Sequence, residues 1–173
     1  MTLILDGTNG MTAPQGAVYN GLQSGTAQAT TSGTAVTFTG IPSWAKRITV
    51  MLNSIGCNTA NSQYLIQIGS GSVTSTGYTS QYWTTAGSGV ITSGFAIGSN
   101  LTSYTMTGVS TLCLIGSNTW VHSGALGFMN VTSTAYNSTG NSSALSGALD
   151  RVVITTVAGT ALFNAGSINI LYE

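Results

Sequence analysis

Charged side chains are nearly absent from this sequence. Its 173 residues include three Lys or Arg and three Asp or Glu, only 3% of the chain, against about 25% in ordinary soluble domains. With a net charge of zero, the chain lacks the basic surface that binds nucleic acid or an anionic membrane. Few charges also leave a monomer poorly protected against association. We therefore expect either burial in an oligomer or an exterior rich in hydroxyl and amide groups, and both suit an extracellular structural particle.

The shortage of acids and histidine argues against catalysis. Glycoside hydrolysis usually needs two carboxylates at a defined separation, and the chain offers only Asp6, Asp150 and Glu173. His122 is the only histidine, and no nucleophile-elbow pattern of the hydrolase type occurs near it. We expect no enzymatic activity and interpret His122 as a strand residue that packs beside Trp120.

Metal-binding residues are equally scarce. Cys57 and Cys113 are the only cysteines, too few for a disulfide framework. With one histidine they do not make a zinc site, and a calcium site would need more carboxylates. We expect no metal or cofactor and two free thiols, with Cys113 as a small core residue of a strand.

Long apolar runs are also missing. No segment approaches the ~20 residues of a membrane-spanning helix, so we expect no membrane insertion. The first ten residues, MTLILDGTNG, lack the basic region and the long apolar core of a signal peptide.

Short alternating segments separated by turn residues dominate instead. Between residues 36 and 55 the chain reads VTFTGIPSWAKRITVMLNSI, which predicts a strand, a corner at Gly40 and Pro42, and a longer strand. Many such strands at ~8–12-residue spacing, without helical periodicity, favour an all-β fold, an antiparallel β-sandwich or jelly roll. We assign residues 34–173 to this domain and residues 1–33 to an extended N-terminal attachment segment.

Four blocks of the chain carry a resemblance. They read GIPSWAKRITVML, TSGFAIG, LCLIGSNTWVHSGALG and ALSGALDRVVITTVAGTALFNAGSINILYE. They resemble the C-terminal domain of phage and prophage tail fibre proteins, and the opening LDGTNGMTAP is similar to leader segments of phage structural proteins. The resemblance covers roughly residues 36–173.

The resemblance implies an antiparallel β knob, usually homotrimeric, at the tip of an adsorption fibre. Such a protein is assembled in the bacterial host cytoplasm, resides in the virion, meets other tail or fibre proteins through its N-terminal segment and attaches to a bacterial surface receptor, often a glycan. The alternative is a structural fibre cap or capsid decoration protein without a ligand of its own. A secreted lectin is a weaker third hypothesis, because no signal peptide is visible.

Aromatic residues are the candidate ligand contacts. They lie in two segments that read as loops, residues 71–89 and 130–143, and neither segment has a charged residue. Aromatic faces and neutral amides suit a neutral glycan, although burial in a subunit interface is an equally good interpretation. The candidate contacts are Tyr78, Gln81, Tyr82, Trp83 and Tyr136.

The few charges are expected to gather in one cluster. Lys46 and Arg47 begin one strongly patterned strand, and Asp150 and Arg151 begin another. We predict that Asp150 pairs with Lys46 or Arg47 across neighbouring strands and that Arg151 completes the cluster.

Overall fold

Every regular element of the described chain is a β-strand. The computed structural model describes the backbone of residues 4–6, 10–12, 18–19, 21–60, 62–85, 87–99, 104–129 and 135–173, and the side chains from residue 21 onward. Within these ranges the strands form three sheets, and all paired strands run antiparallel.

The largest sheet, which we call the front sheet, has nine strands. Its order is β11 (Gly87–Ile91), β10 (Tyr78–Thr84), β15 (Ala135–Ser142), β14 (Thr119–Phe128), β13 (Met106–Gly116), β7 (Arg47–Cys57), β17 (Phe163–Tyr172) and β4 (Gln23–Ser24), with β5 (Gln28–Ala29) also paired to β17.

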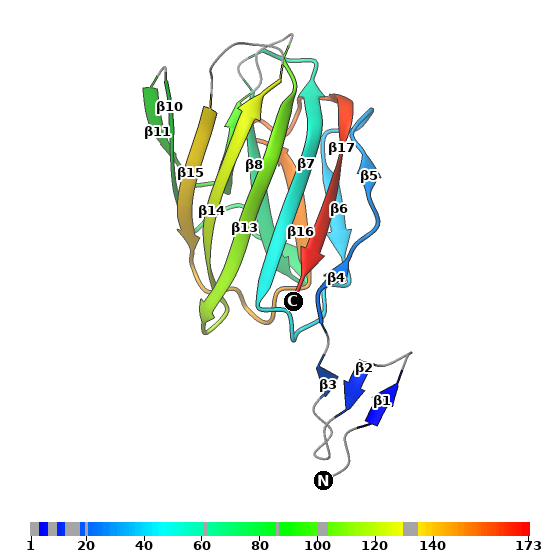
Figure 1. Cartoon of the computed structure of the whole chain (residues 1–173). Helices are drawn as coiled ribbons and strands as arrows, with labels where there is room; N and C mark the ends of the chain where they lie inside the picture. The colour runs from blue at the N-terminus through cyan, green and yellow to red at the C-terminus, as the bar shows by residue number, and fades with distance from the viewer. Residues whose placement is uncertain are drawn as a thin grey trace.

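The back sheet has five strands and lies against the front sheet (Figure 1). Its order is β12 (Phe95–Ser99), β8 (Gln63–Ser70), β16 (Arg151–Thr156) and β6 (Val36–Thr39), and β9 (Ser72–Val73) pairs with β8. The third sheet joins β1 (Ile4–Asp6), β2 (Gly10–Thr12) and β3 (Val18–Tyr19) in the N-terminal segment.

The core lies between the front and back sheets. Every second residue of β7 faces inward at Ile48, Val50 and Leu52, and each is at most 2% exposed. They pack in one cluster with the buried residues of β8 and β16, among them Ile66 and Ile154. The sequence-based prediction of an all-β antiparallel sandwich is therefore confirmed.

The corner between β6 and β7 has the predicted form. Gly40 takes a positive φ of 73°, which favours glycine because a side chain is strained there. The Ala45 N–H donates to the Pro42 carbonyl oxygen and closes the turn. Trp44 packs on Tyr172, with the ring centroids 5.8 Å apart. The corner thus ties the start of β7 to the end of β17.

The two segments interpreted as loops are largely strands, so that interpretation is wrong. Residues 71–89 contain β9, β10 and the start of β11, and residues 135–142 form β15 in the middle of the front sheet. The inward positions of β15 alternate, but after Tyr136 they hold Ser138, Gly140 and Ser142, of which the two serines are buried, so the strand lacks an apolar stripe. Residues 130–134 of the second segment lie outside the described residues.

Part of the expected attachment segment belongs to the sandwich. Strands β4 and β5 pair with β17, and between β5 and β6 the Thr30 side chain is fully buried. The Thr30 N–H donates to the Gly166 carbonyl oxygen, and its hydroxyl donates to the Ala165 carbonyl oxygen. The front sheet therefore includes residues before the expected boundary at residue 33.

The predicted ion pair between Asp150 and the basic residues of β7 is wrong. Arg47 pairs with Glu173, because β7 and β17 are neighbours and the chain ends beside the start of β7. Asp150 pairs with its neighbour Arg151, at 2.7 Å between Oδ1 and Nε, and also accepts from the Gly71 N–H at 3.0 Å. The hydrogen bond from Arg151 holds the pKa of Asp150 below its ordinary value.

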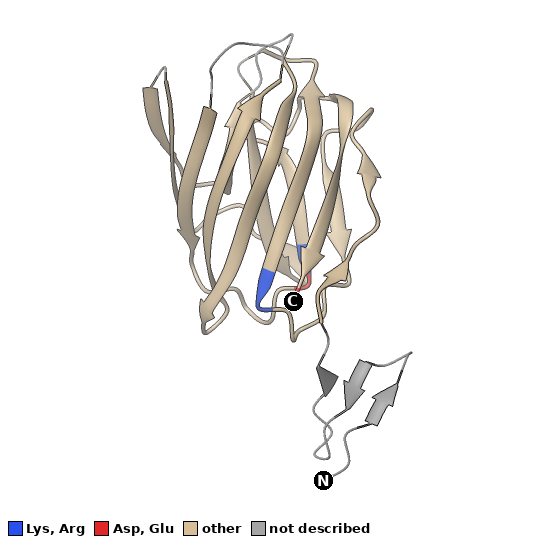
Figure 2. Cartoon of the chain, viewed as in Figure 1, with Lys and Arg blue, Asp and Glu red and all other residues tan. Residues whose placement is uncertain are grey.

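All charged residues whose side chains are described nevertheless lie at one end of the sandwich, near the C-terminus (Figure 2). Strand β4, through which the described N-terminal chain joins the front sheet, pairs with Leu171 and Tyr172 at this same end. The opposite end has no charged residue among those described (Figure 2). We call these two ends the charged end and the neutral end.

Candidate ligand-binding site

Strand β10 separates the aromatic residues that the sequence places close together. Side chains alternate between the two faces of a strand. Tyr78 and Tyr82 therefore lie on the inner face, toward the back sheet, whereas Gln81 and Trp83 lie on the outer face. Gln81 is exposed, and Trp83 is 44% exposed. The candidate contacts from β10 thus belong to two different surfaces.

Tyr78 is a core residue. It is 3% exposed, and its ring meets Phe95 edge-on with the centroids 5.0 Å apart. Its hydroxyl donates to the Thr74 carbonyl oxygen and accepts from the Ile68 N–H, both at 2.9 Å. Burial raises the pKa of Tyr78 to about 12. A fully used and buried hydroxyl leaves Tyr78 nothing to offer a ligand.

Tyr82 and Tyr136 are brought together. Tyr136 comes from β15, beside β10, and is fully buried. The two rings stack with centroids 5.1 Å apart and an angle of 14° between their planes. Gly89, opposite Tyr82 on β11, allows this position, since a Cβ atom there would lie 2.6 Å from the Tyr82 hydroxyl oxygen. The Tyr82 ring therefore lies over the backbone of β11.

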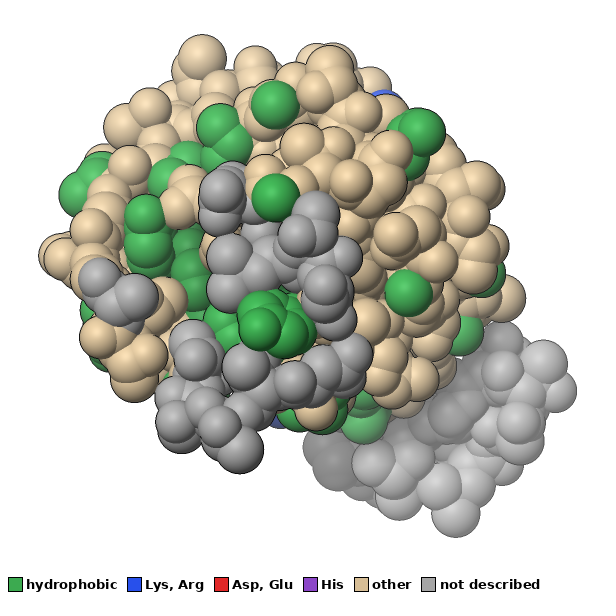
Figure 3. Space-filling view, turned by 90° about the horizontal axis from the view of Figure 1, so that it is seen from above, with side chains coloured by type: hydrophobic (Ala, Val, Ile, Leu, Met, Phe, Trp, Pro, Cys, Tyr) green, Lys and Arg blue, Asp and Glu red, His purple; other side chains and the backbone are tan. Residues whose placement is uncertain are grey.

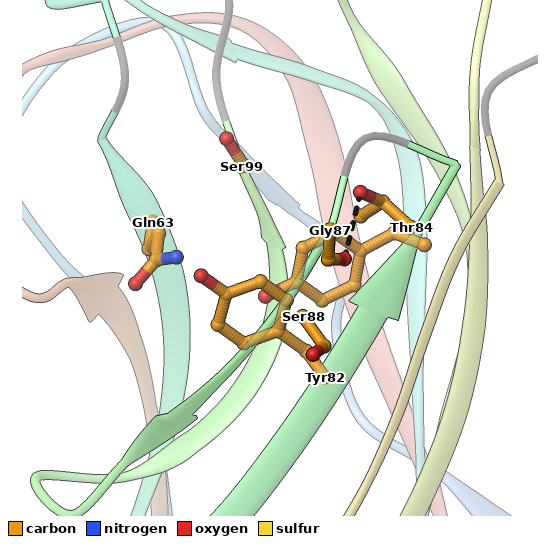
Figure 4. A pocket seen from close by; sticks show the side chains of 7 residues that line it. Gln63, Tyr82, Thr84, Gly87, Ser88 and Ser99 are labelled. Carbon is orange, nitrogen blue, oxygen red and sulfur yellow. Dashed lines mark hydrogen bonds between the residues drawn. The ribbon is translucent and has the colours of Figure 1, made fainter.

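The two tyrosines border a pocket of about 310 Å³ at the neutral end of the sandwich. Figure 4 shows the Gln63 side chain and the Tyr82 hydroxyl turned toward one another, with Ser99 beside them and the hairpin of β10 and β11 opposite. Thr84 Oγ1 donates to the Gly87 carbonyl oxygen at 3.1 Å within this hairpin. The lining residues are Gln63, Tyr82, Thr84, Gly87, Ser88, Ser99 and Tyr136.

None of these lining residues carries a charge. The volume is at the lower end of the ~300–1,000 Å³ range of small-molecule sites. The lining combines aromatic rings with hydroxyls and one amide, which donate and accept neutral hydrogen bonds. Such a lining suits a small, neutral, hydroxyl-rich group.

Sequence reasoning missed Gln63 and Ser99. Both come from the back sheet, at the ends of β8 and β12 that face the β10–β11 hairpin. No local pattern marks them, because only the packing of the two sheets brings them beside Tyr82. Thr84, Gly87 and Ser88 do fall within the segment singled out around the aromatics.

His122 occupies the interior close to these residues. It is 4% exposed, on the same face of β14 as Trp120, as the sequence predicts. Its ring stacks on Phe95, with the centroids 5.0 Å apart, and its Nε2 shares a hydrogen bond with Ser110 Oγ. Burial lowers its pKa to about 4. His122 is therefore neutral at pH 7 and is shielded from any ligand.

The outer face of the front sheet is a second uncharged surface. One row of paired positions runs across five strands through Trp83, Asn137, Ala125, Val109 and Met51. Val109 is 47% exposed. The neighbouring row consists of Gln81, Thr139, Ser123, Thr111 and Thr49. Cys113 also lies on this face, half-buried, whereas its neighbour Leu112 is buried, so its prediction as a core residue is wrong.

Other kinds of site have little support within the described residues. No three of their His, Cys, Asp and Glu side chains are placed to hold a metal ion, and neither Cys57 nor Cys113 forms a disulfide. None of the described segments forms a helix long and apolar enough to cross a membrane. Seen end-on in Figure 3, hydrophobic side chains are visible at several places among polar side chains and backbone.

Comparisons with family models, curated proteins and solved structures found no match to this chain. The features of the chain that bear on its function are therefore the pocket, the distribution of charge and the four sequence blocks with their resemblance.

Proposed function

We propose that this chain is the receptor-binding module at the tip of a phage tail fibre and that its pocket binds a neutral glycan of the bacterial surface. The sequence blocks that resemble tail fibre C-terminal domains support the first part. In this proposal the chain is a homotrimer of the virion, and its N-terminal segment joins it to other fibre proteins.

The pocket at Tyr82 is the observation that carries the proposal. Sugars present apolar ring faces and many hydroxyls, so they need flat aromatic surfaces and neutral hydrogen-bonding partners. Tyr82, which is half-exposed, supplies the aromatic surface, and the neighbouring Gln63, Ser88 and Ser99 supply the neutral hydrogen-bonding groups. A strongly anionic ligand would find no basic partner in this lining.

The direction of the chain fits a fibre tip. The described N-terminal strand β4 joins the sandwich at the charged end, whereas the pocket lies at the neutral end (Figures 1 and 2). A module attached through its N-terminal segment would therefore hold the pocket away from the attachment point, where a receptor can reach it.

A glycan array tests the proposal, with purified protein also used to block phage adsorption to host cells. We expect binding to neutral glycans, and we expect Tyr82→Ala to abolish most of it. Trp83→Ala removes a neighbouring aromatic on the other face of β10 and is the matched control when binding is measured with a monovalent sugar, whose affinity does not depend on assembly. Binding should also change little between ~0.1 M and ~1 M salt, although the Debye length falls from ~10 Å to ~3 Å.

The outer face of the front sheet favours a second candidate, a structural cap without a ligand of its own. Its two rows of uncharged residues suit packing against other subunits. A protein that binds no glycan and does not block adsorption, yet still assembles into fibres, would support this role and contradict the receptor-binding one.

A further inference from the structure

The Tyr136 hydroxyl is buried beside the pocket, out of reach of any partner that the described part of the chain offers. Tyr136 is fully buried, and no hydrogen-bond partner of its hydroxyl is found among the described residues. The buried hydroxyl of Tyr78 differs in this respect, because it accepts a hydrogen bond from the Ile68 N–H and donates one to the Thr74 carbonyl oxygen. An unpaired buried hydroxyl is costly. For folding alone, phenylalanine would serve better at position 136.

The hydroxyl belongs to a residue that lines the pocket. The Tyr82 ring stacks on the Tyr136 ring, and Tyr82 is itself half-exposed. The far end of Tyr82 lies over Gly89, which has no side chain to lock it in place. A modest shift of the Tyr82 ring would therefore open a path from the pocket to the Tyr136 hydroxyl.

The geometry points to a sugar with an acetamido group as the ligand, with the Tyr136 hydroxyl donating to its carbonyl oxygen. This inference rests on the proposed function, since it names the class of neutral sugar that the pocket takes.

A carbonyl oxygen suits this position better than a sugar hydroxyl does. It accepts a hydrogen bond and brings no hydrogen of its own that would need a second buried partner. The acetamido methyl group would pack on the Tyr82 ring, where its burial is favourable. Burial, with a smaller effect of Tyr82, raises the pKa of Tyr136 well above its ordinary value. The phenol is therefore a neutral donor at any ordinary pH.

Two matched pairs of sugars test the inference by NMR titration of the wild-type protein. N-acetylglucosamine and glucose differ only at C2, as do N-acetylgalactosamine and galactose. We expect at least one acetamido sugar to bind about three- to tenfold more tightly than its partner, the effect of one net neutral hydrogen bond. Equal affinities within both pairs would overturn the inference while leaving the proposed function intact.

Two tyrosine variants assign the preference to one hydroxyl. Tyr136→Phe should bring the affinity ratio within the preferred pair close to one. Tyr78→Phe removes a buried hydroxyl outside the pocket and should leave the ratio unchanged. A preference that survives in Tyr136→Phe would overturn the role of Tyr136. Failure of all four sugars to bind would overturn the inference, and glycan-array binding would then decide separately on the proposed function.

Discussion

The imidazole of His122 is buried in the fold, and protonating it there lowers the stability of the protein. His122 is 4% exposed, between Phe95 and Ser110, and burial lowers its pKa from 6.5 to about 4. The unfolded chain therefore binds a proton below about pH 6.5 that the folded chain binds only below about pH 4. Stability must fall as pH falls through this window, and His122 has no effect above it.

We expect the free energy of unfolding to be lower by about 2–3 kcal/mol at pH 4.5 than at pH 7.5, from His122 alone. Urea unfolding at the two pH values measures it. His122→Gln does not titrate, so it should remove most of the difference, whatever it costs at pH 7.5. An equally large difference in this variant would assign the effect to other groups.

The two buried tyrosines should respond oppositely when each loses its hydroxyl. Tyr78→Phe leaves the Thr74 carbonyl oxygen and the Ile68 N–H short of a partner. We expect it to cost about 1–3 kcal/mol. Tyr136→Phe removes a hydroxyl without a partner among the described residues, so the free energy of unfolding should stay within about 0.5 kcal/mol or rise.

Denaturant unfolding of the two variants and the wild type measures these changes. A loss of similar size in Tyr136→Phe would show that its hydroxyl has a partner in solution. The comparison is controlled internally, because both substitutions remove one oxygen atom from a buried ring.

At the scale of the element, sequence alone predicts those strands whose buried positions are apolar. Strand β7 places Ile48, Val50 and Leu52 inward, so its alternation is visible in the sequence. Strand β15 places Ser138, Gly140 and Ser142 at the equivalent positions, and its alternation is hidden. Alternation of apolar and polar residues predicts a strand whose inward positions are apolar. It does not predict a strand whose inward positions are small polar residues.

The candidate site was predictable to the extent that it lies on β10. The aromatic residues mark the segment around Tyr82 in the sequence. Interpreted as a loop, the segment gives no indication that Tyr82 points inward and Trp83 outward, because that follows from the pleat of a strand. Gln63 and Ser99 join the pocket through packing between sheets. Only the three-dimensional arrangement identifies contacts of this kind.

The bulge of β17 at Gly166 is an element that one methyl group should disrupt. Gly166 has a φ of 92°, and a Cβ atom there would lie 2.4 Å from the carbonyl oxygens of Asn53 and Ser54. Backbone strain costs about 1–2 kcal/mol and overpacking about 1–3 kcal/mol, so we expect Gly166→Ala to destabilise the protein by about 2–5 kcal/mol.

Gly159→Ala is the matched control for this prediction. Gly159 also has a positive φ, of 67°, but nothing lies within 4 Å of the position of its Cβ atom. Only the backbone term remains, about 1–2 kcal/mol. Equal losses in the two variants, measured by urea unfolding, would show that β17 relaxes around the added methyl group.

For the whole molecule, the separation of charge from the pocket suggests how copies would assemble. The five charged residues whose side chains are described lie at the charged end, so copies that approached one another through the outer face of the front sheet would meet no like-charge repulsion over most of its area. Exposed apolar residues lie on it, among them Trp83, Val109 and Val121. A homotrimer that buries this face would hide these side chains and leave the pockets open at the neutral end.

Light scattering coupled to size exclusion should accordingly report three times the 17.6 kDa chain mass. Trp83→Ala, which truncates the largest side chain on the outer face, should shift the protein toward smaller species at low micromolar concentration, because buried Trp residues often dominate interface energetics. Leu162→Ala is the control, since Leu162 is similarly exposed at 47% but lies outside the front sheet, and the mass of this variant should equal that of the wild type.

A stable monomer of the wild type would refute the trimer. A Trp83→Ala trimer as stable as the wild type, with weakened glycan binding, would instead make Trp83 a ligand contact and place the glycan on the outer face.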